Sequence, residues 1–112
     1  MSEMNVNAYF EPADNVFVEL DASKTREPVK FGTKVRICAI TVSHGNDDYV
    51  IVSLKRPEDT KPFWKNKFYK GLNGQVFIQP IPKLPLQEVE VVIEPKEGTN
   101  LTDNVIVNLS YI

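Results

Sequence analysis

The chain has 112 residues and a mass of 12.7 kDa, with 42% apolar and 25% charged residues. This composition is typical of one soluble globular domain, and it excludes a disordered acidic tail and a collagen-like repeat. A single cysteine, Cys38, excludes an internal disulfide framework, and a net charge of −2 argues against a bulk attraction to nucleic acid.

The sequence carries no targeting or membrane signal that we can identify. No apolar run approaches the roughly 20 residues that a membrane helix needs. The first residues also lack the basic start and apolar core of a secretory signal. We therefore expect one domain over residues 1–112, with no membrane insertion, and the location of the protein stays open, with a virion among the candidates.

Period-two alternation of apolar and polar residues predicts strands along most of the chain. The first predicted strand covers residues 4–10, where Met4, Val6, Ala8 and Phe10 alternate with polar or aromatic neighbours. The second covers residues 16–20. A polar loop is expected over residues 21–28.

The next predicted strand, residues 34–42, is apolar on both faces. One face carries Val35, Ile37 and Ala39, and the other carries Cys38, Ile40 and Val42. This pattern favours a central strand that is covered on both sides, or a strand in an assembly contact. Residues 43–48 predict a hairpin turn, which leads into a partner strand over residues 49–54.

Three further strands are expected over residues 75–79, 88–94 and 104–111. Pro80 and Pro82 should end the first of them, and residues 94–100 should begin the connection between the other two. The sequence thus predicts an all-β fold, an antiparallel β-sandwich of about seven strands with immunoglobulin-like or jelly-roll topology. A small barrel is the alternative. The expected core residues are Val35, Ile37, Val50, Val52, Val89, Val91, Val107 and Leu109.

Residues that could support catalysis are sparse. The single histidine, His44, lies in the predicted turn, and Cys38 lies inside an apolar strand, where it suggests a buried small hydrophobe. Asp47 and Asp48 supply too few oxygens for a calcium loop. We expect no enzyme activity, no catalytic residues, no metal and no cofactor, and neither His44→Ala nor Cys38→Ser should remove a chemical step.

The most distinctive segment is residues 55–72, which contain six basic and four aromatic residues. It could form a short helix, an edge strand or a loop. It also lies in a central region, residues 28–83, of net charge +6, between two ends that each carry −4. This asymmetry suggests a basic surface that meets an acidic protein surface. The predicted partner-binding residues are Lys61, Trp64, Lys65, Lys67, Tyr69 and Lys70.

Several roles fit this segment. In the simplest, Phe63, Trp64 and Phe68 plug one end of the sandwich while the lysines remain solvated. We favour a non-enzymatic structural or interaction module, such as a small virion or filament component, that binds a protein partner or neighbouring copies. The first alternative is a carbohydrate- or ligand-binding β-sandwich that uses Trp64. The second alternative is an oligonucleotide-binding small barrel.

Overall fold

The structure is a computed structural model that describes residues 14–112, apart from the side chains of residues 78–85. These residues form six strands, which are β1 (Asp14–Leu20), β2 (Arg26–His44), β3 (Val50–Lys55), β4 (Trp64–Phe68), β5 (Gly71–Pro95) and β6 (Val105–Tyr111). The all-β prediction is confirmed. The strand predicted over residues 4–10 lies outside the described residues.

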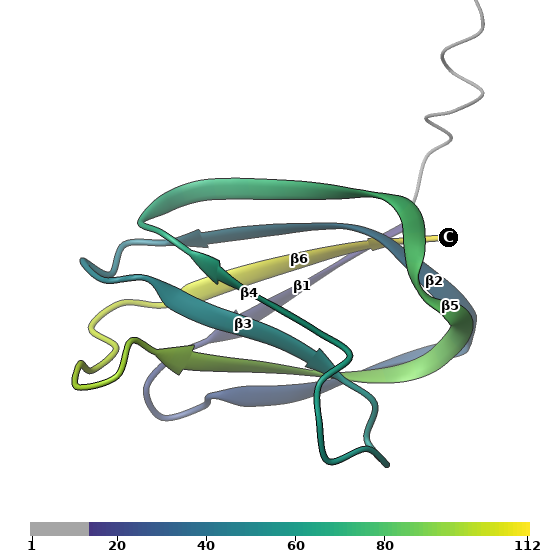
Figure 1. Cartoon of the computed structure of the whole chain (residues 1–112), viewed down its shortest axis with the longest axis horizontal. Coiled ribbons are helices and arrows are strands. Elements are labelled where there is room, and N and C mark those ends of the chain that lie inside the picture. Colours follow the sequence, from purple (N-terminus) through teal and green to yellow (C-terminus); the bar gives the residue numbers. More distant parts are fainter. Residues whose placement is uncertain (1–13) are drawn as a thin grey trace, which may run out of the picture.

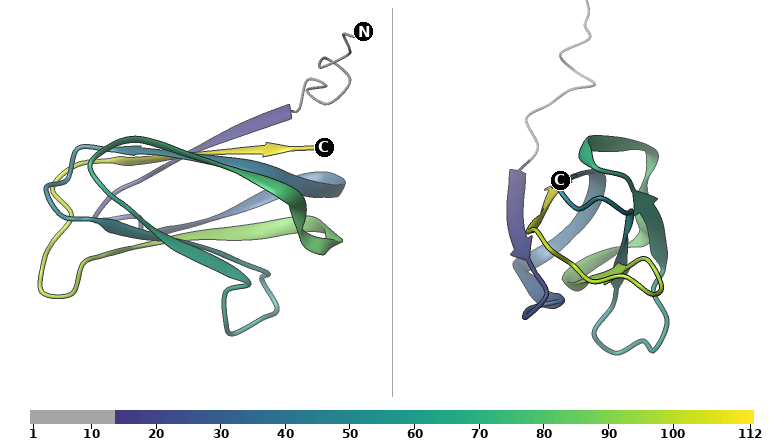
Figure 2. Two further views of the ribbon diagram at one scale, coloured as in Figure 1. Left: turned by 45° about the horizontal axis from the view of Figure 1, so that its top comes forward. Right: turned by 90° about the vertical axis from the view of Figure 1, so that its left-hand side faces the viewer.

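The strands form an antiparallel β-sandwich. Their hydrogen-bonded order is β1-β6-β2-β5-β3-β4, and every pair is antiparallel. The long strands β2 and β5 both bend at the same end of the molecule, so one continuous sheet folds over itself into two layers (Figures 1 and 2). The first layer contains β1, β6, the second half of β2 and the first part of β5. The second layer contains the start of β2, the end of β5, β3 and β4.

The bend in β2 corrects the interpretation of residues 34–42 as a strand with two apolar faces. The pairing register shifts between Val35 and Ile37 and again between Ile37 and Ala39. Such a bulge changes which side of the strand each following residue faces. Val35 and Ile37 therefore point inward before the shift between Ile37 and Ala39, and Ile40 and Val42 point inward after it. The strand is central, and a single core takes residues from both apolar sets, while Ala39 faces outward and Cys38 is half-buried.

The bend in β5 corrects a second expectation. Pro80 and Pro82 do not end a strand, because β5 continues from Gly71 to Pro95 and joins two segments that we predicted as separate strands. Opposite Ile37 and Ala39, which are two steps apart on β2, lie Ile81 and Val76, which are five steps apart on β5. The prolines thus lie where the ladder is interrupted, and a missing N–H is tolerated there.

Two predicted connections are also different in the structure. The loop expected over residues 21–28 is shorter, because Asp21 and Lys24 close a hydrogen-bonded turn and β2 begins at Arg26. The segment 43–48 is not a hairpin turn, since β3 pairs with β4 and β5 and not with β2. It crosses instead from the first layer to the second. After β5, a turn at Lys96–Thr99 begins the return to β6.

The core lies between the two layers and confirms all eight predicted core residues. Val35, Ile37, Val50, Val52, Val89, Val91, Val107 and Leu109 are each at most 4% exposed. Val18 and Leu20 of β1 join them, as do Ile40 and Val42 of β2. Stiff β-branched side chains dominate this core, as expected for a pleated surface.

The two outer faces of the sandwich differ sharply in charge. On the first layer, the ladder registers align twelve outward residues in three rows that each cross all four strands. On the second layer, the strands are offset, and the registers align twelve outward residues in four rows, of which one crosses all four strands. On the first layer, eleven of the twelve are uncharged, and we call these the neutral face: Asn15, Phe17, Ala39, Thr41, Ser43, Leu72, Gly74, Val76, Ile106, Asn108 and Ser110. Glu19 occupies a corner of this face. On the second layer, eight of the twelve are ionisable, and we call this set the charged face: Arg26, Pro28, Lys30, Ile51, Ser53, Lys55, Lys65, Lys67, Glu88, Glu90, Val92 and Glu94.

Candidate protein-binding edge

The basic–aromatic segment contributes β4, which is a strand at the edge of the sheet. Its one ladder partner is β3, with Trp64 opposite Leu54 and Phe68 opposite Val50. Of the three structures that the sequence left open, the edge strand is therefore correct. Lysines on such a strand discourage uncontrolled pairing with another sheet.

The aromatic residues of β4 face the interior. Phe68 is 4% exposed, and Trp64 is half-buried against the core. The Trp64 ring lies 6.1 Å from the Phe68 ring and 5.8 Å from the Phe77 ring, measured between centroids. Phe63 packs against the same cluster. These rings fill the open side of the sandwich between β4 and the first part of β5, so the main role of Trp64 is to stabilise the fold.

The lysines of β4 and one neighbouring tyrosine face solvent. Lys65 and Lys67 alternate with the inward aromatics, and Tyr69 is 62% exposed just beyond the strand. The Tyr69 ring meets the Tyr49 ring edge-on at 5.8 Å, and Lys67 Nζ lies 4.5 Å from the Tyr49 centroid. An ammonium over a tyrosine ring is an attractive cation–π contact. Tyr49, which the sequence analysis did not single out, therefore belongs to this cluster.

Ion pairs join three of the eight ionisable residues of the charged face, and none of the three belongs to β4. Glu90 lies 3.6 Å from Arg26 and 3.5 Å from Lys55, while Lys70 lies 3.4 Å from the exposed Asp47. Among the described residues, Lys61, Lys65 and Lys67 form no ion pair. Their positive charges remain available to an acidic partner. Because β4 is an edge strand, the predicted positions lie along one edge of the molecule.

A cavity of about 600 Å³ opens beside this edge, under the loop between β3 and β4. Lys55, Lys65, Asp59 and Glu94 are among its lining residues. Lys55 Nζ already donates to the carbonyl oxygens of Arg56 and Asp59. The mixture of charges suits a polar protein contact better than a ligand of one charge.

His44 and Asn46 form a buried polar cluster at the opposite end from the bend. The His44 Nε2–H donates to the Phe68 carbonyl oxygen at 2.7 Å, and Nδ1 accepts from the Asn46 backbone N–H at 3.1 Å. Because a backbone N–H can only donate, the proton of the neutral ring lies on Nε2. Both ring nitrogens are engaged with the backbone, which is a structural role for His44.

Asn46 holds two connections together, and sequence reasoning treated it only as a turn residue. Its Oδ1 accepts from the backbone N–H groups of Thr102 and Asp103 at 2.7 and 2.9 Å, and its Nδ2 donates to the Asp103 carbonyl at 3.1 Å. Gly45 lies beside it, and a Cβ at this position would require the Asp103 carboxylate to move. No local pattern could have revealed these contacts, because the partners are more than 50 positions away in sequence.

The other side chains considered for catalysis or metal binding also contact neighbouring parts of the fold. Cys38 is half-buried rather than fully buried, and its Sγ lies 3.4 Å from the Ser110 carbonyl oxygen. Asp48 pairs with Lys96 at 3.6 Å. Within the part of the chain that the structure describes, no three His, Cys, Asp or Glu side chains cluster as metal ligands would. Residues 14–112 also include no helix long and apolar enough to cross a bilayer.

Comparison with known proteins gives little similarity. No protein-family model matches the chain, and no curated protein matches it by sequence. Among solved structures, the coat protein of Tobacco streak virus aligns over 88% of this chain and 87% of its own, with 11% identity and a TM-score of 0.38. A likeness at this level carries no conclusion about what this chain does.

Proposed function

We propose that this chain is a non-enzymatic structural subunit, such as a small virion or filament component, that contacts an acidic protein surface through its β4 edge. The observation that carries the proposal is the arrangement of β4, in which the aromatics face the core while Lys65 and Lys67 remain unneutralised on the outside. The acidic surface can belong to another protein or to a neighbouring copy.

The geometry assigns different tasks to the residues of this edge. Tyr69, with Tyr49 beside it, offers an exposed aromatic surface that a partner can bury. Aromatic residues of this kind supply much of the binding energy in protein interfaces. The lysines raise the rate of encounter with an acidic surface and make it sensitive to salt. Trp64 supports the position of the strand from inside.

The half-buried position of Trp64 disfavours the carbohydrate alternative, which needed an exposed Trp64 platform. The acidic flanks disfavour the oligonucleotide alternative, because most of that affinity comes from phosphate contacts. Neither alternative is supported by a specific feature of the described residues.

The experiment is sedimentation velocity of the full chain over a range of concentrations, at low and high salt. Replacing Lys65, Lys67 and Lys70 with alanine should reduce salt-sensitive association. Replacing Lys24, Lys30 and Lys34 with alanine changes the net charge equally, away from β4, and should have little effect. Soluble glycans or a single-stranded oligonucleotide that bind the wild type, and not the β4 variant, would contradict the proposal in favour of the corresponding alternative.

A further inference from the structure

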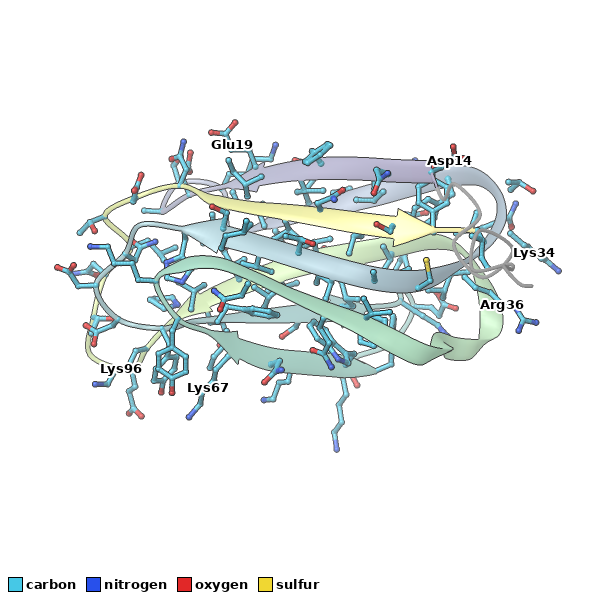
Figure 3. The ribbon with its side chains drawn as sticks, turned by 90° about the horizontal axis from the view of Figure 1, so that it is seen from above. Asp14, Glu19, Lys34, Arg36, Lys67 and Lys96 are labelled. Carbon is cyan, nitrogen blue, oxygen red and sulfur yellow. The ribbon has the colours of Figure 1, made fainter. Side chains whose placement is uncertain are left out.

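The neutral face is a grid whose rows are defined by the strand registers. Its middle row runs across the four strands as Phe17, Asn108, Thr41 and Gly74. The only ionisable residue of the grid, Glu19, lies at a corner. Figure 3 looks onto this layer, and the six charged residues that it labels lie around its margin rather than over its middle.

The relief of this face alternates between large and small side chains. Phe17 on β1 is 70% exposed, and Leu72 and Val76 on β5 are 76% and 77% exposed. Gly74 lies between the latter two and leaves a gap, since a Cβ added there would meet only Thr41 Oγ1, at 3.7 Å. Exposed apolar side chains gathered on one uncharged face mark an interaction surface.

We propose that the neutral face binds the neutral face of a second copy, around a two-fold axis parallel to its strands. This axis keeps the rows and reverses the order of the strands. Phe17 of each copy then lies over Gly74 of the other, and Asn108 lies over Thr41. A large side chain thus enters a gap twice in every pair, as an interface between identical patches requires.

Charge also favours a second copy as the occupant. Packed sheets usually align within about 30° of each other, so the two-fold axis must lie nearly parallel or nearly perpendicular to the strands. Around either axis, a residue at a corner of the grid lies over a different corner of the other copy, so the two Glu19 side chains do not face each other. Around the parallel axis, Glu19 lies over Leu72 of the other copy, and no charge in the grid opposes a like charge. The charged face does not keep its charges apart in this way when two copies pair, because charged side chains also occupy the interior of that face.

This pairing uses the layer opposite β4, so it stands independently of the proposed function. An association through β4 should weaken as salt rises, because it depends on lysines. An association through the neutral face should persist at high salt, because it depends on apolar burial. The two proposals can therefore fail separately.

A cross-link between two cysteines tests the arrangement, made with a bifunctional maleimide that spans about 10 Å, the distance between the faces of packed sheets. In the full chain carrying Cys38→Ser, we would introduce Phe17→Cys and Gly74→Cys together. Within one copy these positions are three strands apart, about 14 Å, which is beyond the reach of this reagent. A covalent dimer on a non-reducing gel is therefore expected only between copies. Gly74 has no positive φ, so cysteine can adopt its backbone conformation.

Matched variants make the outcome decisive. Phe17→Cys alone should not cross-link, nor should Phe17→Cys combined with Lys65→Cys on the charged face. If Phe17→Cys alone cross-links efficiently, β1 lies over β1 of the other copy, and the proposed axis is wrong. If none of the variants cross-links while all remain folded by circular dichroism, the neutral face does not pair with itself.

A second measurement does not depend on cysteine chemistry. Phe17→Lys should weaken the self-association measured by sedimentation at high salt by about tenfold or more, as expected for an aromatic residue that fills a gap in the partner surface. Val92→Lys introduces the same charge at an apolar residue of the charged face, and it should leave the association unchanged. Equal weakening by both variants, or a wild type that stays monomeric at high protein concentration, would overturn the proposal.

Discussion

The two outer faces of this sandwich cover the same core and follow the same alternation, yet they have opposite compositions. Eight of the twelve outward residues on the second layer are ionisable, while Glu19 is the single ionisable residue among the twelve on the first. The core requires only that every second residue point inward and be apolar. The outward residues are free of that requirement, so their contrast indicates different surroundings for the two faces.

The largest loss of stability should come from substitutions in the core, and it should be similar behind the charged face and behind the neutral face. Val91 lies behind the charged face and Val107 behind the neutral face, and both are fully buried. Val91→Asp and Val107→Asp should each cost about 4 kcal/mol or more, because each buries an unpaired charge. Thermal unfolding by circular dichroism measures this, and an unchanged melt for Val91→Asp would contradict the core assignment.

A smaller but still substantial effect is expected where the layers are joined. Asn46 links the crossover from β2 to β3 with the return from β5 to β6. Asn46→Ala should reduce the free energy of unfolding by about 3 kcal/mol, since it leaves buried backbone groups unpaired. Urea denaturation measures the loss. Exposed Asn66→Ala is the control, and equal losses in the two variants would show that Asn46 does not hold the layers together.

The third prediction places a charge at the middle of each face. Thr41→Lys puts an ammonium at the centre of the neutral face and should weaken self-association at high salt by about tenfold or more. Val92→Lys puts the same group on the charged face and should leave that association within about twofold. Sedimentation equilibrium measures both. If Val92→Lys weakens self-association more than Thr41→Lys does, the charged face and not the neutral face mediates the association.

A fourth, weaker effect compares the carboxylates. Glu90 lies near both Arg26 and Lys55, whereas the Glu19 carboxylate accepts a hydrogen bond from Asn104 Nδ2. Glu90→Gln should cost about 0.5–1 kcal/mol in low salt, and less as salt screens the pairs. Glu19→Gln should cost less than Glu90→Gln. Urea unfolding at two salt concentrations compares them, and no loss for Glu90→Gln at either salt concentration would show that the ion pairs contribute nothing.

The smallest predicted effect lies in the turn that leads from the first layer to the second. The Ser23 hydroxyl and backbone N–H groups donate to Asp21 and hold the pKa of its carboxyl below the usual 3.8. A lowered pKa stabilises the fold at pH values above the unfolded pKa, and this contribution disappears as pH falls through the folded pKa. Asp21→Asn should flatten the acid side of the stability profile slightly. A profile identical to the wild type would show that the turn does not use the charge.

Alternation predicted the inward side of each strand well, because burial acts on single residues. It could not predict how strands combine. The apolar residues on both faces of the predicted strand 34–42 suggested that both faces are covered. A sequence pattern does not reveal a β-bulge, which changes the side of the strand that the following residues face. Likewise, Pro80 and Pro82 suggested a strand end, although a bent strand tolerates them where its ladder is interrupted.

The candidate surfaces were predictable to different degrees. The lysines at 61, 65, 67 and 70 stood out in sequence, and the structure gathers them along one edge. The inward orientation of Trp64 depends on its pairing with Leu54, and the role of Tyr49 depends on β3 lying beside β4. The neutral face depends on the alignment of residues from four strands that are scattered over the chain. Only the registers bring Phe17, Thr41 and Gly74 into one row.

The bend shared by β2 and β5 has a mechanical consequence. Each of these strands belongs to both layers, so the covalent backbone itself runs through the fold from one face to the other. A load applied to the charged face therefore reaches the neutral face along two continuous chains, in addition to side-chain packing. Shearing one layer over the other would require bending the backbone at two places together, which makes the sandwich stiff against sliding.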